Sequence, residues 1–354
     1  MGKVLMKGNE VIAEAAVHAG CKYFFGYPIT PQSELVAYMA RRLPEVGGLF
    51  LQAESEIAAI NMVYGAASTG VRVMTSSSSP GFSLKQEGIS YLVGAELPAV
   101  ICNIVRGGPG LGNIQPAQSD YFQVTKGGGH GDYNLPVLAP ASLQEIVELT
   151  QDAFDIADRY RTPVILMGDG MLGQMMEPVE FMERSEREKI EKPWATTGTR
   201  GDGAPKIVTS LELDAEGLEK RNWGLQQKFA RIKESEVRYE AYLTGDAEYV
   251  MVAYGTVARI TMNAINRARQ DGVKVGLIRP ISLWPFPEKP FIETRDRVKA
   301  YISVEMSAGQ MVEDVRLAVN GHAPVDFFGR TGGVVPTQEE IYEKIMTVAG
   351  GVSV

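Results

Sequence analysis

Residues 27–34, YPITPQSE, place a threonine hydroxyl between two prolines and end in an acid. Thr30 suits two roles. As a helix N-cap it would be followed by Pro31 at the first helical position and by a helix over residues 32–43. It also follows the apolar stretch CKYFFGY, which is typical of a buried strand. Since ligands of parallel α/β sheets bind where a strand ends and a helix begins, the Thr30 hydroxyl could alternatively face a ligand.

Two acids, Glu54 and Glu56, stand at a second strand-to-helix junction in LQAESEIAAINMVYGAAS. The simpler interpretation is electrostatic, because acids are favourable near the partial positive charge of a helix N-terminus. The residues that follow are almost all apolar or small, however, which predicts a buried helix. An acid at the start of such a helix faces an apolar pocket and is able to donate or share a proton.

Arg106 stands between the apolar stretch PAVICNIV and the glycine-rich GGPGLG of residues 107–112. This loop matches neither the dinucleotide fingerprint nor the Walker loop, so nucleotide phosphate is not the expected ligand. Its glycines exceed the needs of one turn and favour a loop whose backbone approaches a ligand. Arg106 is then either a solvated strand-end residue or a residue whose guanidinium binds a carboxylate through two hydrogen bonds.

The stretch MGDGM, residues 167–171, resembles the opening of the magnesium-diphosphate motif of thiamine enzymes. That motif ends in an asparagine-rich segment about two dozen residues later. The following PVEFMERSEREKIEKPW contains no asparagine, so we interpret GDG as a strand-end turn.

The elements around these residues alternate between strand and helix patterns. Strands are predicted at CKYFFGY, LFLQA, VRVMTS, PAVICNIV and PVILMGD, and helices at 9–20, 56–68 and 143–159, with Asn9 as a possible cap. We interpret SSSPGFS as a turn and the polar, glycine-rich residues 112–133 as a lid or binding loop. The βαβ order predicts an α/β fold with a mainly parallel, doubly wound sheet.

The chain is expected to have three parts, namely 1–183, 184–246 and 247–354. Residues 184–246 are charged and then rich in glycine and threonine, and they include a polar helical stretch; they predict a connector with an exposed or partner-facing helix. A second α/β unit begins at EYVMVAYGT and ends in a helix from Gln338.

Composition narrows the classes of function. The 354 residues, 45% of them hydrophobic, are enough for two cores. A net charge of −8 argues against a nucleic-acid surface, and no apolar run could span a bilayer, so we expect a cytoplasmic protein. Cys21 and Cys102 are expected to be buried, and neither an iron–sulfur cluster nor a protein-held metal is expected from this chain alone.

Several stretches together resemble the α-type subunit of 2-oxoacid:ferredoxin oxidoreductases, the thiamine diphosphate and iron–sulfur enzymes that oxidise 2-oxo acids to acyl-CoA. They are GYPITPQSE, AESEIAAINMVYGAA, MTSSSSPGFSLKQEG, IVRGGPGLGNIQPAQSDYFQ with GGGHGDY, and SVEMSAGQMVEDVR. The resemblance covers nearly the whole chain. QPAQSDYFQ and GGGHGDY look most like the branched-chain type, which acts on 3-methyl-2-oxobutanoate (2-oxoisovalerate), with the 2-oxoglutarate type as the alternative. The family resemblance implies a pyrimidine-binding thiamine-enzyme domain followed by a transketolase C-terminal-like domain.

The resemblance also implies roles for individual residues. Glu56 occupies the position of the acid that hydrogen-bonds the aminopyrimidine N1′ and favours the imino form that activates the thiazolium. Thr30 would place its hydroxyl near the thiazolium and the substrate, and Arg106 would bind the carboxylate of the 2-oxo acid. Tyr27, Pro28, Ile29 and Thr30 would line the cofactor.

Thiamine diphosphate would then be shared with a partner. The resemblance implies a β-type subunit that holds the diphosphate and Mg²⁺, γ- and δ-type subunits, 4Fe-4S clusters on partner chains, ferredoxin as the electron acceptor and CoA as a co-substrate. The alternative functional class for this chain is a non-catalytic assembly or nucleotide-binding subunit.

Overall fold

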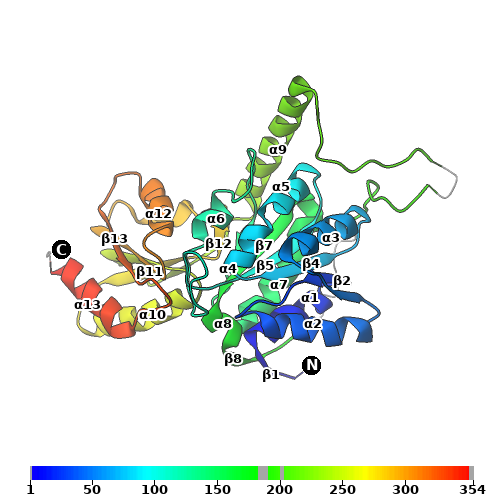
Figure 1. Cartoon of the computed structure of the whole chain (residues 1–354). Coiled ribbons are helices and arrows are strands. Elements are labelled where there is room, and N and C mark those ends of the chain that lie inside the picture. The colour runs from blue at the N-terminus through cyan, green and yellow to red at the C-terminus, as the bar shows by residue number, and fades with distance from the viewer. Residues whose placement is uncertain (1, 182–189, 200–202, 351–354) are drawn as a thin grey trace.

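The computed structural model describes residues 2–181, 190–199 and 203–350. It contains two α/β units, and a long helix, α9 (Ala215–Ser235), projects away from the first of them (Figure 1). Within the described residues, no helix is both long enough and apolar enough to cross a membrane.

The first unit is built on a seven-stranded sheet with the strand order β12-β6-β7-β5-β4-β2-β3. Neighbouring strands are parallel except for the antiparallel pair of β12 and β6. This confirms the predicted α/β fold with a mainly parallel sheet. The strands are β2 (Tyr23–Gly26), β3 (Leu49–Gln52), β4 (Val73–Ser77), β5 (Ala99–Val105), β6 (Val137–Leu138), β7 (Pro163–Asp169) and β12 (Ser282–Trp284).

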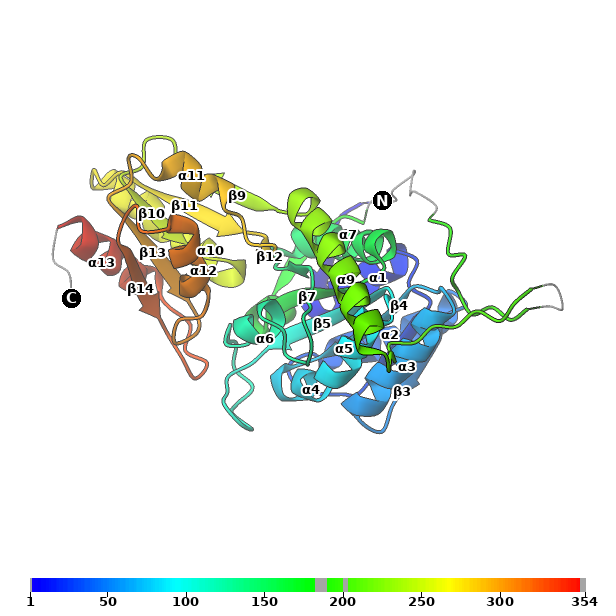
Figure 2. The same cartoon turned by 90° about the horizontal axis from the view of Figure 1, so that it is seen from above.

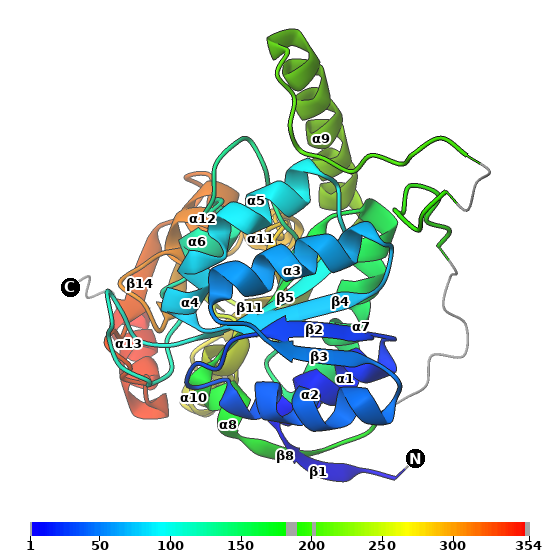
Figure 3. The ribbon, with the colours of Figure 1, turned by 45° about the vertical axis from the view of Figure 1, so that its right-hand side comes forward.

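Helices cover both faces of this sheet (Figure 3). One face packs against α1 (Gly8–His18), α2 (Ser33–Glu45) and α7 (Leu143–Tyr160), and the other against α3 (Glu56–Ser68), α4 (Ser79–Leu84) and α5 (Gln86–Gly94). Each face has its own apolar core, as expected for strands buried on both sides. Smaller elements are α6 (Tyr121–Thr125), α8 (Gly170–Gln174) and the antiparallel pair of β1 (Val4–Lys7) and β8 (Met176–Val179).

The second unit lies beside the first (Figure 2) and has a five-stranded sheet with the order β14-β13-β10-β11-β9. Only β9 is antiparallel to its neighbour. The strands are β9 (Tyr239–Tyr242), β10 (Tyr249–Val252), β11 (Val275–Pro280), β13 (Ala300–Glu305) and β14 (Val325–Gly329), and the helices are α10 (Gly255–Gln270), α11 (Lys289–Thr294), α12 (Met311–Val319) and α13 (Gln338–Ala349).

Chain segments cross between the two units. β12, although late in the sequence, joins the first sheet, and the Gln118 side chain bridges the units by donating to the Tyr254 carbonyl and accepting from the Met306 amide, both at 3.0 Å. β9, from within residues 184–246, joins the second sheet. The division at 183 and 246 therefore stays a proposal.

Helix α9 has two different halves. Its C-terminal half packs into the first unit through Leu225, Phe229 and Ile232, all buried, whereas Trp223 on its N-terminal half is 63% exposed. The charged and glycine-rich parts of the predicted connector fall partly at 182–189 and 200–202, outside the described residues.

Three local predictions were wrong. Helix α2 begins at Ser33 with Gln32 as its cap, because an extra turn, in which the Gln32 amide donates to the Ile29 carbonyl, separates Thr30 from the helix. SSSPGFS is helical from Ser79, with Pro80 in the first turn where its missing N–H costs little. Asn9 lies inside α1, and its side chain binds the Pro31 carbonyl instead of capping.

Candidate active site

The predicted site residues follow three strands of the first sheet, and a fourth strand, β4, lies among them. Arg106 follows β5, the loop 27–31 follows β2, and Glu56 follows β3, while β4 ends at Ser77 between them. Because these strands are parallel, their carboxyl ends lie at one edge of the sheet. The structure therefore brings Thr30, Glu56 and Arg106 to the same edge, where ligands of such folds bind.

Glu56 is buried, with 6% exposure, although it opens helix α3. The cap of this helix is Ser55, whose hydroxyl accepts a hydrogen bond from the Ala58 amide at 3.2 Å. Glu54 is exposed, so burial distinguishes the two acids. Within the described residues, no donor is hydrogen-bonded to the Glu56 carboxylate. The side chain is largely buried, but its carboxylate oxygens are not sealed from solvent, so a ligand can reach them.

Helix α4, which follows β4, begins against this carboxylate. A Cβ atom built on Gly81 would stand 2.3 Å from Glu56 Oε1 and 2.4 Å from Ser77 Oγ, so only glycine fits there. The hydroxyls of Ser77 and Ser78 are buried and have no hydrogen-bond partner among the described residues. Glu56 is thus surrounded by polar groups that a bound molecule could satisfy.

The loop 27–31 is held from several sides. The Gln32 side chain, which is fully buried, accepts from the Ser76 hydroxyl at 2.6 Å and donates to the Tyr27 carbonyl at 3.3 Å. Asn9 donates to the Pro31 carbonyl at 2.7 Å. Thr30 itself is exposed, and its hydroxyl caps no helix. Sequence reasoning missed Gln32, since its role depends on β4, which is distant in sequence.

Arg106 is buried and already bound to the protein backbone. Its guanidinium donates to the Thr30 carbonyl at 2.9 Å and to the Leu111 carbonyl at 3.3 Å. Its Nε is buried without a partner among the described residues. An arginine carries five N–H donors, so Arg106 can hold its loop and still offer a donor to a carboxylate.

A polar cluster supports the start of α4. The Ser79 hydroxyl donates to Asp120 at 2.8 Å, and the Asn103 amide donates to the same carboxylate oxygen at 2.9 Å. Burial raises the pKa of Asp120, and these two hydrogen bonds oppose the shift. The Arg106 amide donates to the Ser79 hydroxyl at 3.0 Å, so the cluster also fixes Arg106.

Lys85 is the other residue that sequence reasoning missed. Its side chain is fully buried, and its ammonium donates to the Thr75 hydroxyl at 3.1 Å and to the Glu56 carbonyl at 3.5 Å. Burial lowers the pKa of Lys85 to about 7, against the opposing effect of the Glu56 charge. The stretch FSLKQEG carries no local signal of this, because a lysine between helical residues is ordinarily solvated.

Asp169, from the GDG stretch, ends β7 and caps α8. Its carboxylate accepts from the amides of Met171 and Leu172 at 2.9 and 3.0 Å. GDG therefore lies at a strand end, as predicted, but it leads directly into helix α8 instead of a turn. Cys21 and Cys102 are both buried thiols, as expected, and burial raises the pKa of Cys21 to about 12.

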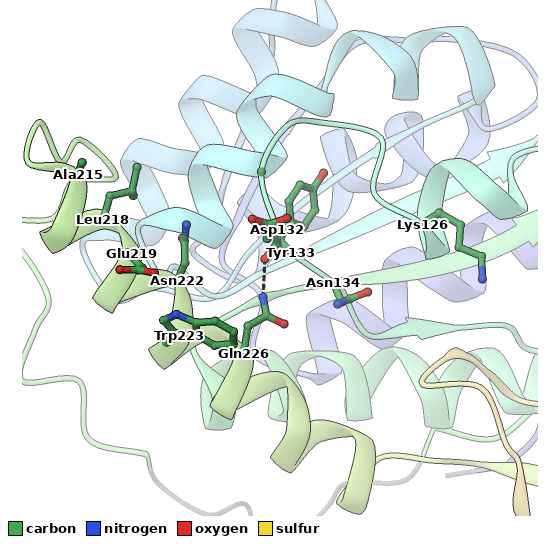
Figure 4. Close-up of a pocket in the computed structure, with 11 residues that line it drawn as sticks. Lys126, Asp132, Tyr133, Asn134, Ala215, Leu218, Glu219, Asn222, Trp223 and Gln226 are labelled. Atoms are coloured by element: carbon green, nitrogen blue, oxygen red, sulfur yellow. Dashed lines mark hydrogen bonds between the residues drawn. The ribbon is translucent and has the colours of Figure 1, made fainter.

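Two pockets are lined in part by residues of the first unit. One, of about 670 Å³, is lined by Arg106 and Ser79 of the first unit and by Met306 and Gln310 of the second. The other, of about 770 Å³, lies between α9 and residues 131–134, where Gln226 donates to the Asp132 carbonyl at 2.7 Å (Figure 4). Only the first contains a predicted site residue.

The fold and this edge of the sheet define an α/β chain of the thiamine-enzyme class. The chain belongs to the pyruvate flavodoxin/ferredoxin oxidoreductase family: residues 14–237 match its thiamine diphosphate-binding domain, and residues 247–341 match core domain II of pyruvate:ferredoxin oxidoreductase. It is an α-type subunit of a 2-oxoacid:ferredoxin oxidoreductase, as the sequence motifs predicted.

Full-length relatives agree with this assignment. The chain is 53% identical over 350 residues to the ketoisovalerate oxidoreductase subunit VorB of Methanothermobacter thermautotrophicus, with 99% of each chain covered. It is 36% identical to the 2-oxoglutarate synthase subunit KorA of Methanothermobacter marburgensis, with 96% of this chain and 98% of the relative covered.

Solved structures confirm the predicted fold. A 2-oxoglutarate:ferredoxin oxidoreductase from Magnetococcus marinus, with 2-oxoglutarate, coenzyme A and succinyl-CoA bound, matches with a TM-score of 0.84 and 26% identity. The match covers 99% of this chain and 66% of that one. A split-gene transketolase, at 14% identity and a TM-score of 0.61, shares the fold alone.

Proposed function

We propose that the chain serves an oxidoreductase that converts 3-methyl-2-oxobutanoate and CoA to a branched acyl-CoA and CO₂, with reduction of ferredoxin. The higher identity to the ketoisovalerate subunit, 53% against 36% for the 2-oxoglutarate subunit, supports this substrate. A similar protein of known structure has 2-oxoglutarate bound, so this dicarboxylic acid is the alternative substrate.

The residues around Glu56 fit thiamine diphosphate. The observation that carries the proposal is that Glu56 is only 6% exposed while no described residue donates a hydrogen bond to its carboxylate. The buried hydroxyls of Ser77 and Ser78 also have no partner among the described residues. Bound thiamine diphosphate supplies a nucleophilic carbon and an electron sink for the decarboxylation of a 2-oxo acid. Glu56 would hydrogen-bond the N1′ nitrogen of the aminopyrimidine and share its proton, and residues 27–30 would line the cofactor.

Thr30 and Arg106 would bind the substrate. The guanidinium of Arg106, which lines the pocket of about 670 Å³, would donate to the carboxylate of the 2-oxo acid, and the exposed Thr30 hydroxyl would hydrogen-bond an oxygen of the same molecule. Both residues are held in place by backbone contacts before any substrate arrives, which lowers the cost of ordering them.

Partner chains would supply the remaining functions. The Asp169 carboxylate is occupied by two amides of its own chain, and no asparagine follows it in the expected segment, so a β-type subunit would hold the diphosphate and Mg²⁺. The 4Fe-4S clusters would lie on partner chains, with γ- and δ-type subunits completing the complex and ferredoxin accepting the electrons.

Calorimetry tests the cofactor site. The purified chain is titrated with thiamine diphosphate and Mg²⁺, first alone and then with its β-type partner. Binding only in the presence of the partner supports a shared site. Tight binding of ATP or NAD by the lone chain, without thiamine diphosphate binding in either sample, would favour the non-catalytic class.

A panel of 2-oxo acids tests the substrate. The reconstituted complex is assayed with CoA and a viologen dye as the electron acceptor. We expect the highest kcat/KM on 3-methyl-2-oxobutanoate. A clear preference for 2-oxoglutarate would instead assign the chain to a 2-oxoglutarate:ferredoxin oxidoreductase.

A further inference from the structure

Met306 and Gln310 of the second unit line the pocket that contains Arg106, yet the proposed function assigns no role to that unit. We propose that Gln310 is a positioning residue, whose side chain fixes residues 119–122 and, through them, the place of Arg106 at the pocket. This inference rests on the proposed binding of the 2-oxo acid by Arg106. It adds a residue of the second unit to that site.

The Gln310 side chain holds one short segment of the first unit at two points. Its amide nitrogen donates to the Ser119 carbonyl at 2.7 Å, and its amide oxygen accepts from the Phe122 amide at 2.8 Å. Since one partner can only accept and the other can only donate, the side-chain amide fits in a single orientation. Asp120, which precedes helix α6, lies between the two contacts and is held from both sides.

Two routes connect this segment to Arg106. In the first, the Asp120 carboxylate accepts from the Ser79 hydroxyl at 2.8 Å, and the Ser79 hydroxyl accepts from the Arg106 amide at 3.0 Å. In the second, Arg106 pairs directly with Pro116 in an isolated antiparallel bridge, just ahead of the segment. A displacement of residues 119–122 would therefore reach the backbone of Arg106.

The backbone of Gln310 is fixed by its own unit. Glu305, at the end of β13, is fully buried, and its carboxylate accepts from the three successive amides of residues 310–312 at 3.0, 2.9 and 2.9 Å. Gly309 has a φ of +102°, a conformation that other residues rarely adopt, and turns the chain before Gln310. The Gln310 side chain therefore extends from an ordered backbone, which lowers the cost of holding the first unit.

Gln118 attaches the same region to the second unit independently. Its main-chain amide donates to the Met306 carbonyl at 2.8 Å, in addition to the side-chain contacts with Tyr254 and Met306. These contacts do not involve Gln310. Loss of the Gln310 side chain should therefore loosen residues 119–122 without separating the two units.

Gln144 on α7 provides a matched control. Its amide nitrogen donates to the Glu180 carbonyl at 3.2 Å, and its amide oxygen accepts from the Glu180 amide at 3.0 Å. The side chain thus makes the same two kinds of hydrogen bond as Gln310, but to the residue that follows β8. Neither Gln144 nor Glu180 lines the pocket that contains Arg106. Gln144→Met removes an equivalent pair of contacts without changing the surroundings of Arg106.

The first test uses the reconstituted complex. Gln310→Met keeps the length of the side chain and removes both hydrogen bonds. We expect KM for the 2-oxo acid to rise by about tenfold, the size of one weakened hydrogen bond to a charged group, with kcat and thiamine diphosphate binding within about twofold of wild type. Gln144→Met should leave KM unchanged. An unchanged KM in Gln310→Met, or an equal rise in both variants, would overturn the proposal.

A double variant tests whether Gln310 acts through Arg106. Arg106→Lys already removes the guanidinium that Gln310 is proposed to position. Adding Gln310→Met to it should therefore raise KM by much less than the further factor of about ten expected of independent residues. A full multiplicative rise would show that Gln310 acts on another part of the site, and would refute the positioning role.

The third test needs neither substrate nor cofactor. Hydrogen exchange of the full chain, followed by mass spectrometry, measures local opening of the peptides that contain residues 119–122 and Arg106. We expect faster exchange of both peptides in Gln310→Met and of neither in Gln144→Met. Faster exchange confined to residues 119–122 would refute the connection to Arg106. An unchanged KM in Arg106→Lys would refute the proposed function of Arg106 separately, because the exchange is measured without substrate.

A second substitution covers the case in which Gln310→Met does not fold. Gln310→Glu keeps an acceptor for the Phe122 amide but places an oxygen against the Ser119 carbonyl, where a donor is required. It should also raise KM and the exchange of residues 119–122. Wild-type values of both quantities would overturn the proposal.

Discussion

The guanidinium of Arg106 donates a hydrogen bond to the main-chain carbonyl of Thr30 at 2.9 Å. The two residues proposed to bind the substrate are thus joined through the backbone, and the Thr30 hydroxyl has no hydrogen-bond partner among the residues that the structure describes. Since the Arg106 amide also bonds the Ser79 hydroxyl, one arginine connects the strand ends of β2, β4 and β5. Substitutions of Arg106 should therefore disturb both the guanidinium that would bind the substrate carboxylate and the loop that carries Thr30.

Arg106→Lys should raise KM for the 2-oxo acid by about tenfold or more while thiamine diphosphate binding is unchanged. Lysine keeps the charge, but its donors all lie on one nitrogen and lack the planar fork that lets the guanidinium hold the two carbonyls and still bind a carboxylate. Steady-state kinetics and calorimetry on the reconstituted complex measure the two effects. Arg161→Lys is the control, because Arg161 lies over Trp194, outside the site. A loss of cofactor binding would instead assign Arg106 to the diphosphate.

Thr30→Val should leave the melting temperature unchanged, because the Thr30 hydroxyl caps no helix and the side chain is exposed. If the hydroxyl contacts substrate, kcat/KM should fall by an order of magnitude or more, equivalent to about 1.4 kcal/mol of transition-state stabilisation. Thr30→Ser should retain most activity, and Ser33→Ala serves as a nearby control. Unchanged kinetics in Thr30→Val would mean that the hydroxyl takes no part in binding.

Glu56→Gln should fold and assemble normally but lose ~10²- to 10⁴-fold in turnover, the usual contribution of a general acid or base. Glu54→Gln, at the exposed acid of the same junction, should stay within a few-fold of wild type. Both variants are compared by kcat and by melting of the complex. If the two results are exchanged, Glu54 is the cofactor-contacting acid and the burial argument is wrong.

The central parallel strands and the long helices were predictable because their residues form clear local patterns. PVILMGD became β7, Pro163–Asp169, and EIAAINMVYGAAS became α3, Glu56–Ser68, since an apolar run between polar turns permits few alternatives. SSSPGFS was misread as a turn, because serine and proline favour turns and first helical turns alike.

The features that sequence reasoning missed depend on contacts between distant segments. β12 pairs with β6 although more than a hundred residues separate them, and Gln32 becomes a loop anchor only through Ser76. The buried position of Lys85 is evident only from its contacts with Thr75 and with the start of α3. Motif resemblance indicated Glu56, Thr30 and Arg106, whereas their supporting residues have no signature of their own.

Gly81→Ala should lower kcat and weaken thiamine diphosphate binding, because the added methyl group would displace the Glu56 carboxylate, whose Oε1 lies 2.3 Å from the Cβ position. The matched control is Gly65→Ala in α3, where the Cβ atom meets nothing within 4 Å. That change should be neutral or stabilise the chain by up to about 1 kcal/mol through helix propensity. Wild-type activity in Gly81→Ala would show that the carboxylate position is not critical.

The stability of the chain should rise with pH above neutrality through Lys85. Its pKa is lowered to about 7 in the folded chain, whereas the unfolded chain keeps the ordinary, higher value. Between these values the unfolded state binds more protons, so the free energy of unfolding increases with pH by up to about 1.4 kcal/mol per unit. Below pH 7 both states are protonated, and the folded chain bears the full cost of the buried charge.

Lys85→Met should remove this rise. Urea unfolding at pH 6 and pH 9 measures it as the difference between wild type and variant, which cancels the titration of other groups. We expect the variant's stability advantage over wild type to shrink from pH 6 to pH 9. Lys220→Met, at an exposed position of α9, should run parallel to wild type. Parallel curves for Lys85→Met as well would mean that Lys85 keeps its proton throughout this range, and that the protein pays for its burial by other contacts.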